Sequence, residues 1–219
     1  MTISAAQVKE LRDATGAGMM DCKRALQETS GSFDDAVKYL REKGMAKAAK
    51  RASKVASEGA VASYIHMGGK IGVLVEVNCE TDFVARGEAF QTFVKDICLQ
   101  ICSASPVYVT KEEVPQSAYD EEKEVYVKQA QETGKPQNIC EKIAEGKMNK
   151  WFSEVCLMEQ PFVKEDKKTI KDLMAELTAK CGEKIVIRRF VRYQLGEGIE
   201  KEQTDFAAEV AAELAKVQQ

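Results

Sequence analysis

The spacing of the apolar residues changes at Gly59, and this change is the strongest constraint on the fold. Before Gly59 the apolar residues recur every three or four positions, as the buried stripe of a helix requires; one such set is Phe33, Ala36, Val37 and Leu40. After Gly59 they recur at every second position, the period of a half-buried strand; an example is Val73, Val75 and Val77. Separate blocks of the two patterns predict an α+β fold.

Residues 1–44 are predicted to form a three-helix bundle. Ser4 and Gln7 have the spacing of a capping box at the start of the first helix. The second helix spans about 19–28, and Ser32 caps the third. The buried stripe of the second helix is expected to contain Met19, Cys22 and Leu26. Gly44 is expected to end the third helix, because glycine is favoured just past a helix C-terminus.

Residues 45–58 are rich in alanine and lysine and are expected to form a partly helical, basic linker. The cationic residues are Lys47, Lys50, Arg51 and Lys54. The same residues are compatible with an arm that binds phosphate groups. No aromatic residue is interleaved with them to stack on bases, which favours the solvated linker.

Residues 59–195 are expected to form a core with a three-stranded antiparallel sheet. A glycine-containing turn at 67–70 joins the first two strands, and the third strand spans 184–195. A helix that ends at Pro106 and another that begins at Thr169 and ends at Gly182 complete the core. Two polar helices at about 116–156 are expected to form a protruding αα-hairpin, with a thin apolar seam made of Tyr126, Ile139 and Ile143.

Residues 196–219 are expected to form a C-terminal module. Gly196-Glu197-Gly198 is predicted to be a flexible joint, and a short amphipathic helix follows at about 204–217. One face of that helix carries Phe206, Val210 and Leu214. This stripe must be buried against the chain's own core or against another protein.

Composition excludes several classes of function. The formal net charge is −3 and the isoelectric point is about 5.5, so a protein whose main task is to bind nucleic acid is not expected. No apolar run approaches the length of about 18 residues that spans a membrane. Seven scattered cysteines without a CxxC motif indicate free thiols of a cytoplasmic protein, and leave a single intermolecular disulfide open.

The sequence contains little that predicts an active site. His66 is the only histidine, and neither a GxxxxGK phosphate loop nor a GxGxxG motif after a strand is present. Cys98 and Cys102 have the spacing of a metal-binding pair on a helix, but Cys98 falls on the apolar face and is expected to pack in the core. We therefore expect a protein that is not an enzyme and has no cofactor and no metal site.

The segment Asn78-Cys79-Glu80-Thr81-Asp82-Phe83-Val84-Ala85 lies between a predicted strand and a predicted helix. In one interpretation Asp82 caps the helix and Phe83 is a core residue, which is the common arrangement at such a position. In the other interpretation an acid and an aromatic ring are presented at an exposed tip. Composition alone does not decide between the two.

Three motifs resemble signatures of the elongation factor Ts family. The first is Thr15-Gly16-Ala17-Gly18-Met19-Met20-Asp21-Cys22-Lys23, the second is centred on Thr81-Asp82-Phe83-Val84, and the third is Gly196-Glu197-Gly198-Ile199-Glu200-Lys201, continuing to Ala207. They occur in the order of that family, and the similarity extends over nearly the whole chain. The segment Tyr64-Ile65-His66-Met67-Gly68 also resembles a histidine-containing turn of the family.

The resemblance implies a fold and a mechanism. The fold is a ubiquitin-associated-like bundle, a core with a small sheet, a helical hairpin and a C-terminal helix. The partner is GDP-bound elongation factor Tu, from which Thr81, Asp82, Phe83 and Val84 would displace Mg²⁺ and so promote GDP release. Docking on the partner would use Met19, Met20, Lys23, His66 and the Phe206, Val210 and Leu214 stripe.

The resemblance also favours a homodimer. The longest family members carry two similar half-repeats in the core, whereas this chain carries one, so two chains would replace one long one. The alternative function is a ubiquitin- or peptide-binding adaptor that uses the N-terminal bundle to recognise its ligand.

Overall fold

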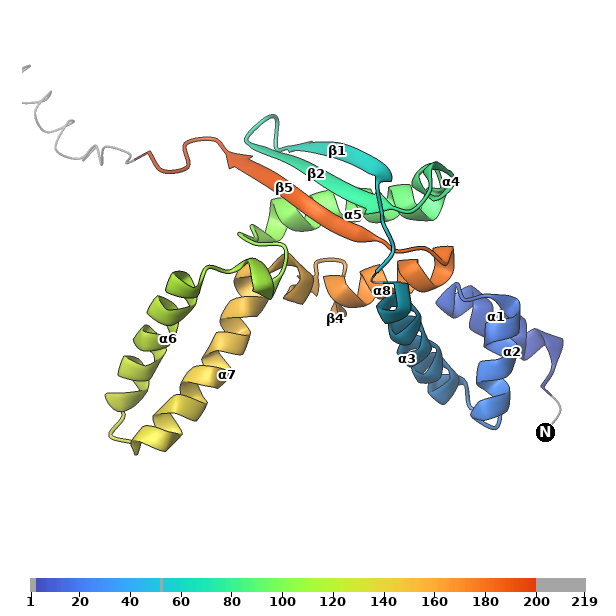
Figure 1. The fold of residues 1–219 in the computed structure, drawn as a ribbon, viewed down its shortest axis with the longest axis horizontal. Helices are drawn as coiled ribbons and strands as arrows, with labels where there is room; N and C mark the ends of the chain where they lie inside the picture. The colour runs from blue at the N-terminus through green and yellow to red at the C-terminus, as the bar shows by residue number, and fades with distance from the viewer. Residues whose placement is uncertain (1–2, 52, 200–219) are drawn as a thin grey trace, which may run out of the picture.

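The computed structural model describes residues 3–51 and 53–199 (Figure 1). It has the expected α+β architecture, with three N-terminal helices, a core built on a three-stranded antiparallel sheet, and a long helical hairpin. The predicted C-terminal helix, with Phe206, Val210 and Leu214, lies outside the described residues. No helix within the described residues combines the length and the hydrophobicity needed to cross a membrane.

The N-terminal bundle consists of α1 (Ala5–Thr15), α2 (Met19–Glu28) and α3 (Phe33–Arg51). The predicted capping box is present, because the Ser4 hydroxyl accepts from the Gln7 amide while the Gln7 side chain accepts from the Ser4 amide. The helices pack around a small core made of Val8, Leu11, Cys22, Ala25, Leu26 and Ala36. Met19, which was expected on this buried stripe, is instead exposed at the start of α2.

The prediction that the third helix ends at Gly44 is wrong. α3 continues through Gly44 to Arg51 and packs against α8 (Ile170–Cys181). A Cβ atom added to Gly44 would lie 3.2 Å from the Cβ atom of Ala179, which is tighter than ordinary van der Waals contact. The glycine therefore permits a close helix crossing that connects the bundle to the core.

The sheet contains β1 (Glu58–His66), β2 (Ile71–Cys79) and β5 (Val186–Gln194), in the order β1-β2-β5. Both pairs are antiparallel, and Leu74 lies opposite Ser63 on one side and Val191 on the other. α5 (Glu88–Ala104) packs along one face of the sheet (Figure 1), and α8 contacts α5. The strand period and the turn at 67–70 are as the sequence predicts.

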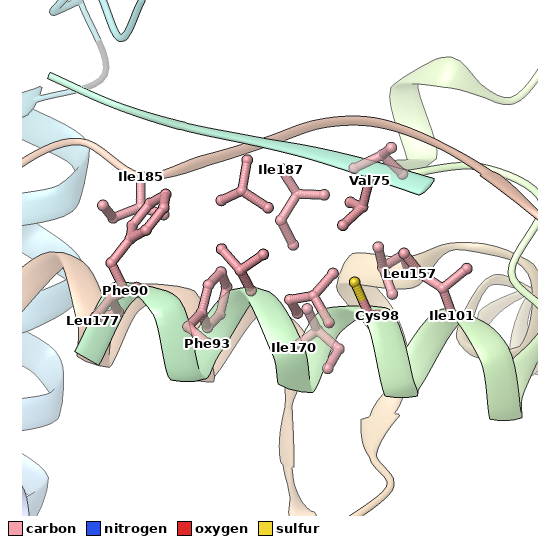
Figure 2. Close-up of a cluster of buried hydrophobic side chains, with 14 of the residues drawn as sticks. Val75, Phe90, Phe93, Cys98, Ile101, Leu157, Ile170, Leu177, Ile185 and Ile187 are labelled. Atoms are coloured by element: carbon pink, nitrogen blue, oxygen red, sulfur yellow. The ribbon is translucent and has the colours of Figure 1, made fainter. Parts of the chain in front are cut away.

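The main core fills the space between the sheet, α5 and α8. Figure 2 shows Val75 and Ile187 of the sheet directed toward Phe90, Phe93 and Ile101 of α5. Cys98 and Cys102 are both buried in this core, as expected. The seven cysteines form no disulfide within the chain.

The helical hairpin consists of α6 (Gln116–Gln131) and α7 (Gln137–Val155), and it projects from the core (Figure 1). Its position is as predicted, and Tyr126 and Ile143 of the predicted seam are half-buried, but the fully buried residues are others. The buried residues are Ala130, Cys140, Ala144 and Met148, whereas Ile139 is exposed. Three of these four buried side chains are small, and the bulkier Ile139 is partly exposed to solvent instead.

Several short elements join the larger ones. The 3-10 turns are η1 (Lys111–Glu113) and η2 (Leu157–Glu159), and α4 is a single turn (Asp82–Ala85). A small hairpin that the sequence did not predict is formed by β3 (Pro161–Phe162) and β4 (Glu165–Thr169). Thr169 then caps α8 in a capping box with Asp172, and Gly182 ends the helix in the left-handed conformation.

Gly59 provides a test of the sheet register. Its φ angle is +141°, and an added Cβ atom would lie 2.1 Å from the Val77 carbonyl oxygen. We expect Gly59→Ala to lower the free energy of unfolding by at least about 2 kcal/mol, because it adds a steric clash to a strained backbone conformation. Urea unfolding would measure the change.

The matched control is Gly146→Ala in α7, where an added Cβ atom meets no other atom within 4 Å. This substitution is expected to raise the free energy of unfolding by up to about 1 kcal/mol, because alanine is the better helix former. Equal stability of the two variants would contradict the register described above.

Candidate functional site

The segment that composition left undecided forms the turn between β2 and α5. β2 ends at Cys79, α4 occupies Asp82–Ala85, and α5 begins at Glu88. Figure 1 places α4 next to the end of the sheet at which β2 stops. The Thr81-Asp82-Phe83-Val84 motif is therefore at a corner of the core, and we call these four residues the tip.

Phe83 is 84% exposed, the largest exposed fraction of any large apolar side chain among the described residues. The interpretation that it is a core residue is wrong. Thr81, and not Asp82, is the N-cap of α4, because its hydroxyl accepts from the Val84 amide at 3.4 Å. The exposed-tip interpretation is confirmed for the position of the ring, while its role stays a prediction.

The inner side of the tip is attached to the core. Val84 is half-buried against the core cluster and Ala85 is buried, so the single turn of α4 has one anchored side. The Gln91 side chain also donates to the Ala85 carbonyl at 2.7 Å. The turn is thereby attached to the core through Val84 and Ala85, while the Phe83 ring is exposed to solvent.

Within the part of the chain that the structure describes, the acid at the tip has one ionic partner. The Asp82 carboxylate pairs with the Arg86 guanidinium one helical turn later, and both side chains are largely exposed. Ion pairs of this kind contribute little to stability, because water and salt screen them. Asp82 can therefore exchange this partner for another at small cost.

Two acidic residues that the sequence reasoning missed hold the base of the tip. Glu80 accepts from the Lys184 amide at 2.6 Å and from the Arg51 guanidinium at 2.7 Å, and these contacts lower the pKa of its carboxyl. Glu183 accepts from Thr81. The contacts of Glu80 with Lys184 and of Glu183 with Thr81 link positions about a hundred residues apart, so no local pattern in the sequence signals them.

The docking residues predicted on α2 are accessible. Met19 and Met20 are both exposed at the start of the helix, Met20 by 68%, and Lys23 is exposed one turn later. Two neighbouring exposed methionines form an adaptable apolar surface, because the unbranched thioether side chain fits irregular partners. The structure does not bring these residues into contact with the tip.

His66 lies at the opposite end of the sheet from the tip. It is half-buried at the end of β1, and its Nδ1 atom is 2.9 Å from the Tyr64 hydroxyl. β1 and β2 pair along their full length, so His66 and the start of the tip are separated by the length of β2, roughly 25 Å. The two sites must contact different parts of any partner.

The chemistry of the described residues offers little for catalysis. Burial raises the pKa of the Cys79, Cys98 and Cys156 thiols to about 11, so few thiolates exist at neutral pH. Among the described residues, no group of three or more His, Cys, Asp or Glu side chains is arranged to hold a metal ion. What remains distinctive is the exposed aromatic tip.

Comparison with known proteins identifies the family. The family model described as Elongation factor TS matches residues 2–197. The chain belongs to the elongation factor Ts family. It is 62% identical to the elongation factor Ts of Geobacter metallireducens and 61% identical to that of Geobacter sulfurreducens, in each case over 97% of this chain and 98% of the relative. The protein of Carboxydothermus hydrogenoformans is 56% identical with the same coverage.

Family membership decides between the functions predicted from the sequence. Elongation factor Ts is the guanine-nucleotide exchange factor of elongation factor Tu. Elongation factor Ts is itself a cytoplasmic translation factor and not an enzyme. This chain is accordingly an exchange factor, and the adaptor alternative is set aside. Which of its residues carry out the exchange is a separate question that the geometry of the tip helps to answer.

The exposure of Phe83 predicts that its ring is dispensable for folding. We expect Phe83→Ala to change the free energy of unfolding by less than about 0.5 kcal/mol, because the ring packs against little of the chain. The matched substitution Phe90→Ala, at a fully buried ring, is expected to cost about 3–5 kcal/mol. Thermal or urea unfolding of both variants would measure this, and similar losses would contradict the assignment of Phe83 to the surface.

Proposed function

We propose that the tip is the element with which this chain displaces Mg²⁺ from GDP-bound elongation factor Tu. The observation that supports this most strongly is the exposure of Phe83 on a turn anchored from below. An exposed aromatic side chain on a fixed backbone is suited to enter a partner, because little chain entropy remains to be lost when it binds.

The two side chains at the tip have different tasks. Phe83 acts as an apolar wedge between elements of the partner near the metal site. Asp82 breaks its ion pair with Arg86 and attracts the residues or the water that hold the ion. Once the ion moves, the charge of the diphosphate is uncovered and GDP binds more weakly. Thr81 and Val84 frame the tip and fix its direction.

The tip alone supplies too little free energy for this task. Burial of one phenylalanine side chain yields roughly 1.5–3 kcal/mol. A shift of a two-state equilibrium from 1:99 to 99:1 requires about 5.5 kcal/mol of differential binding. Other surfaces must supply the remainder, and we assign this role to Met19, Met20 and Lys23 of α2, to His66, and to the Phe206, Val210 and Leu214 stripe.

A second copy of this chain is the other partner that we propose. The sheet face opposite α5 carries exposed apolar side chains from all three strands; we call it the outer sheet face, and it contains Val61, Ile65, Leu74, Val191 and Tyr193. None of the described elements covers it (Figure 1). A contiguous apolar patch of this kind marks an interaction site.

A copy of the same sheet is the occupant that fits this face. Two antiparallel sheets pack face to face when both inner faces are apolar. At one edge of the patch Glu76 pairs with Arg188 and Arg189, so that edge is charged while the centre is apolar. The longer family members carry a second half-repeat in the core, and a second chain would take its place here.

The exchange activity of the tip is tested by the release of fluorescent GDP from elongation factor Tu in a stopped-flow instrument. We expect Phe83→Ala to slow the accelerated release about 10- to 100-fold, the range that corresponds to the burial energy of the ring. The concentration that gives half-maximal acceleration should change much less, because the docking surfaces are intact.

The matched control is Val163→Ala, which truncates another exposed apolar side chain far from the tip in sequence. With this variant, elongation factor Tu should release GDP at the rate measured with the wild-type protein. Excess Mg²⁺ should slow release with the wild-type protein, since the ion competes with its own displacement. A Phe83→Ala variant as active as the wild type would show that the ring is not the wedge.

The dimer is tested by sedimentation equilibrium in the presence of a reducing agent, which removes any intermolecular disulfide. The wild-type protein should have twice the mass of the 24.3 kDa chain. Val191→Glu should dissociate it, because the substitution places a charge inside the apolar contact. Val125→Glu, in α6 at the same 46% exposure, is the control and should leave the dimer intact. A monomeric wild-type protein would refute this proposal.

A further inference from the structure

We infer that Glu183 is a positioning residue for exchange and fixes the direction of the tip from the connection between α8 and β5. This inference rests on the proposed role of the tip. Glu183 lies in the connection between α8 and β5, directly after Gly182, whose φ angle of +71° turns the chain out of the helix. Its carboxylate thus faces a segment that precedes it by about a hundred residues.

The contact between Glu183 and Thr81 is bidentate. One carboxylate oxygen accepts from the Thr81 hydroxyl at 2.7 Å, and the other accepts from the Thr81 backbone amide at 3.0 Å. Hydrogen bonds to a charged acceptor are shorter and stronger than neutral ones. Two such bonds to one residue fix both its side chain and its backbone.

The Thr81 hydroxyl passes this constraint on to α4. A hydroxyl has one hydrogen to donate and two lone pairs to accept with. Because Glu183 takes the hydrogen, the lone pairs are directed elsewhere, and one accepts from the Val84 amide at 3.4 Å. Glu183 therefore sets the orientation of the N-cap on which the single turn of α4 depends.

A second carboxylate connects the same two segments reciprocally, from the tip side to the connection between α8 and β5. Glu80, next to Thr81, accepts from the amide of Lys184, next to Glu183. Glu80 also accepts from Arg51, the last residue of α3. Glu80 and Thr81 are thus both attached to the connection between α8 and β5. Glu80 is attached in addition to α3, the last helix of the bundle.

The tip needs this support because it has little of its own. α4 has four residues, and a helix of that length is not stable alone in water. The Phe83 ring is too exposed for packing to fix its position. Its direction is set by the backbone of residues 81–84, and Glu183 holds the first of these. Loss of Glu183 should leave a tip that still docks but enters the partner less often in the productive direction.

The experiment measures GDP release from elongation factor Tu as a function of the concentration of the full-length chain. We expect Glu183→Ala to lower the maximal release rate about tenfold, as the loss of charge-assisted hydrogen bonds in a partly exposed site implies. The half-saturating concentration should change less than about twofold, since α2 and the remaining docking surfaces are untouched. Glu183→Gln keeps one acceptor oxygen and should restore part of the rate.

Two further measurements separate positioning from general stability. Hydrogen exchange at the Thr81 amide should be faster in Glu183→Ala, while exchange in α5 stays unchanged. The control Glu165→Ala removes another acid that makes an ion pair, with Lys168 at 3.3 Å, and should keep the wild-type rate. If Glu183→Ala does not fold, the maximal rate of Glu183→Gln decides: an intermediate rate supports the inference, and a wild-type rate overturns it.

Failure of this inference is distinguishable from failure of the proposed function. A wild-type maximal rate in Glu183→Ala, an equal loss in Glu165→Ala, or a loss confined to the half-saturating concentration would overturn the positioning role. If Phe83→Ala, measured in parallel, is slow while Glu183→Ala is not, only the positioning role fails. If both variants behave as the wild type, the proposed role of the tip fails and the positioning role fails with it.

Discussion

The packing of β2 against α5 is the constraint on which the rest of the structure depends. Val73, Val75 and Val77 face the core, and Cys79 is buried at the end of the strand. The next buried anchor of comparable size is Phe90 in the first turn of α5. The chain between these points makes a tight turn that buries Ala85 on its inner side and leaves Asp82 and Phe83 on the outer side. The exposure of the tip follows from the positions of its two flanking elements, and Glu80 and Glu183 then make it rigid.

Periodicity and capping residues predicted most of the elements, because they are local properties. The capping box at Ser4, the turn at 67–70 and the end of α8 at Gly182 are where the sequence placed them. The prediction that Gly44 ends α3 was wrong because this glycine serves a tertiary contact. It permits a close approach to Ala179, and the pattern along α3 gives no sign of that neighbour. The strands β3 and β4 are too short to show a period. Local pattern alone did not predict the exposure of Phe83, since a phenylalanine at such a position is more commonly buried. Only the family resemblance favoured the surface.

The division of tasks within the molecule follows from magnitudes. In the proposed mechanism one aromatic ring cannot supply the free energy of nucleotide displacement, so a small tip would have to be combined with separate docking surfaces. The bundle and the tip are connected through α3, which packs on α8 and whose last residue, Arg51, contacts Glu80 at the base of the tip. The coupling between exchange factor and nucleotide must be reciprocal, so GDP weakens the binding of this chain by the same factor by which this chain weakens the binding of GDP.

The most direct test follows the Phe83 ring itself. A fluorinated phenylalanine at position 83 gives a ¹⁹F resonance that reports whether the ring is in water. We expect a solvent-exposed signal in the free protein and a shifted, solvent-protected signal in the complex with nucleotide-free elongation factor Tu. Addition of GDP should restore the signal of the free protein. A resonance that stays solvent-exposed in the complex would contradict the claim that the ring enters the partner.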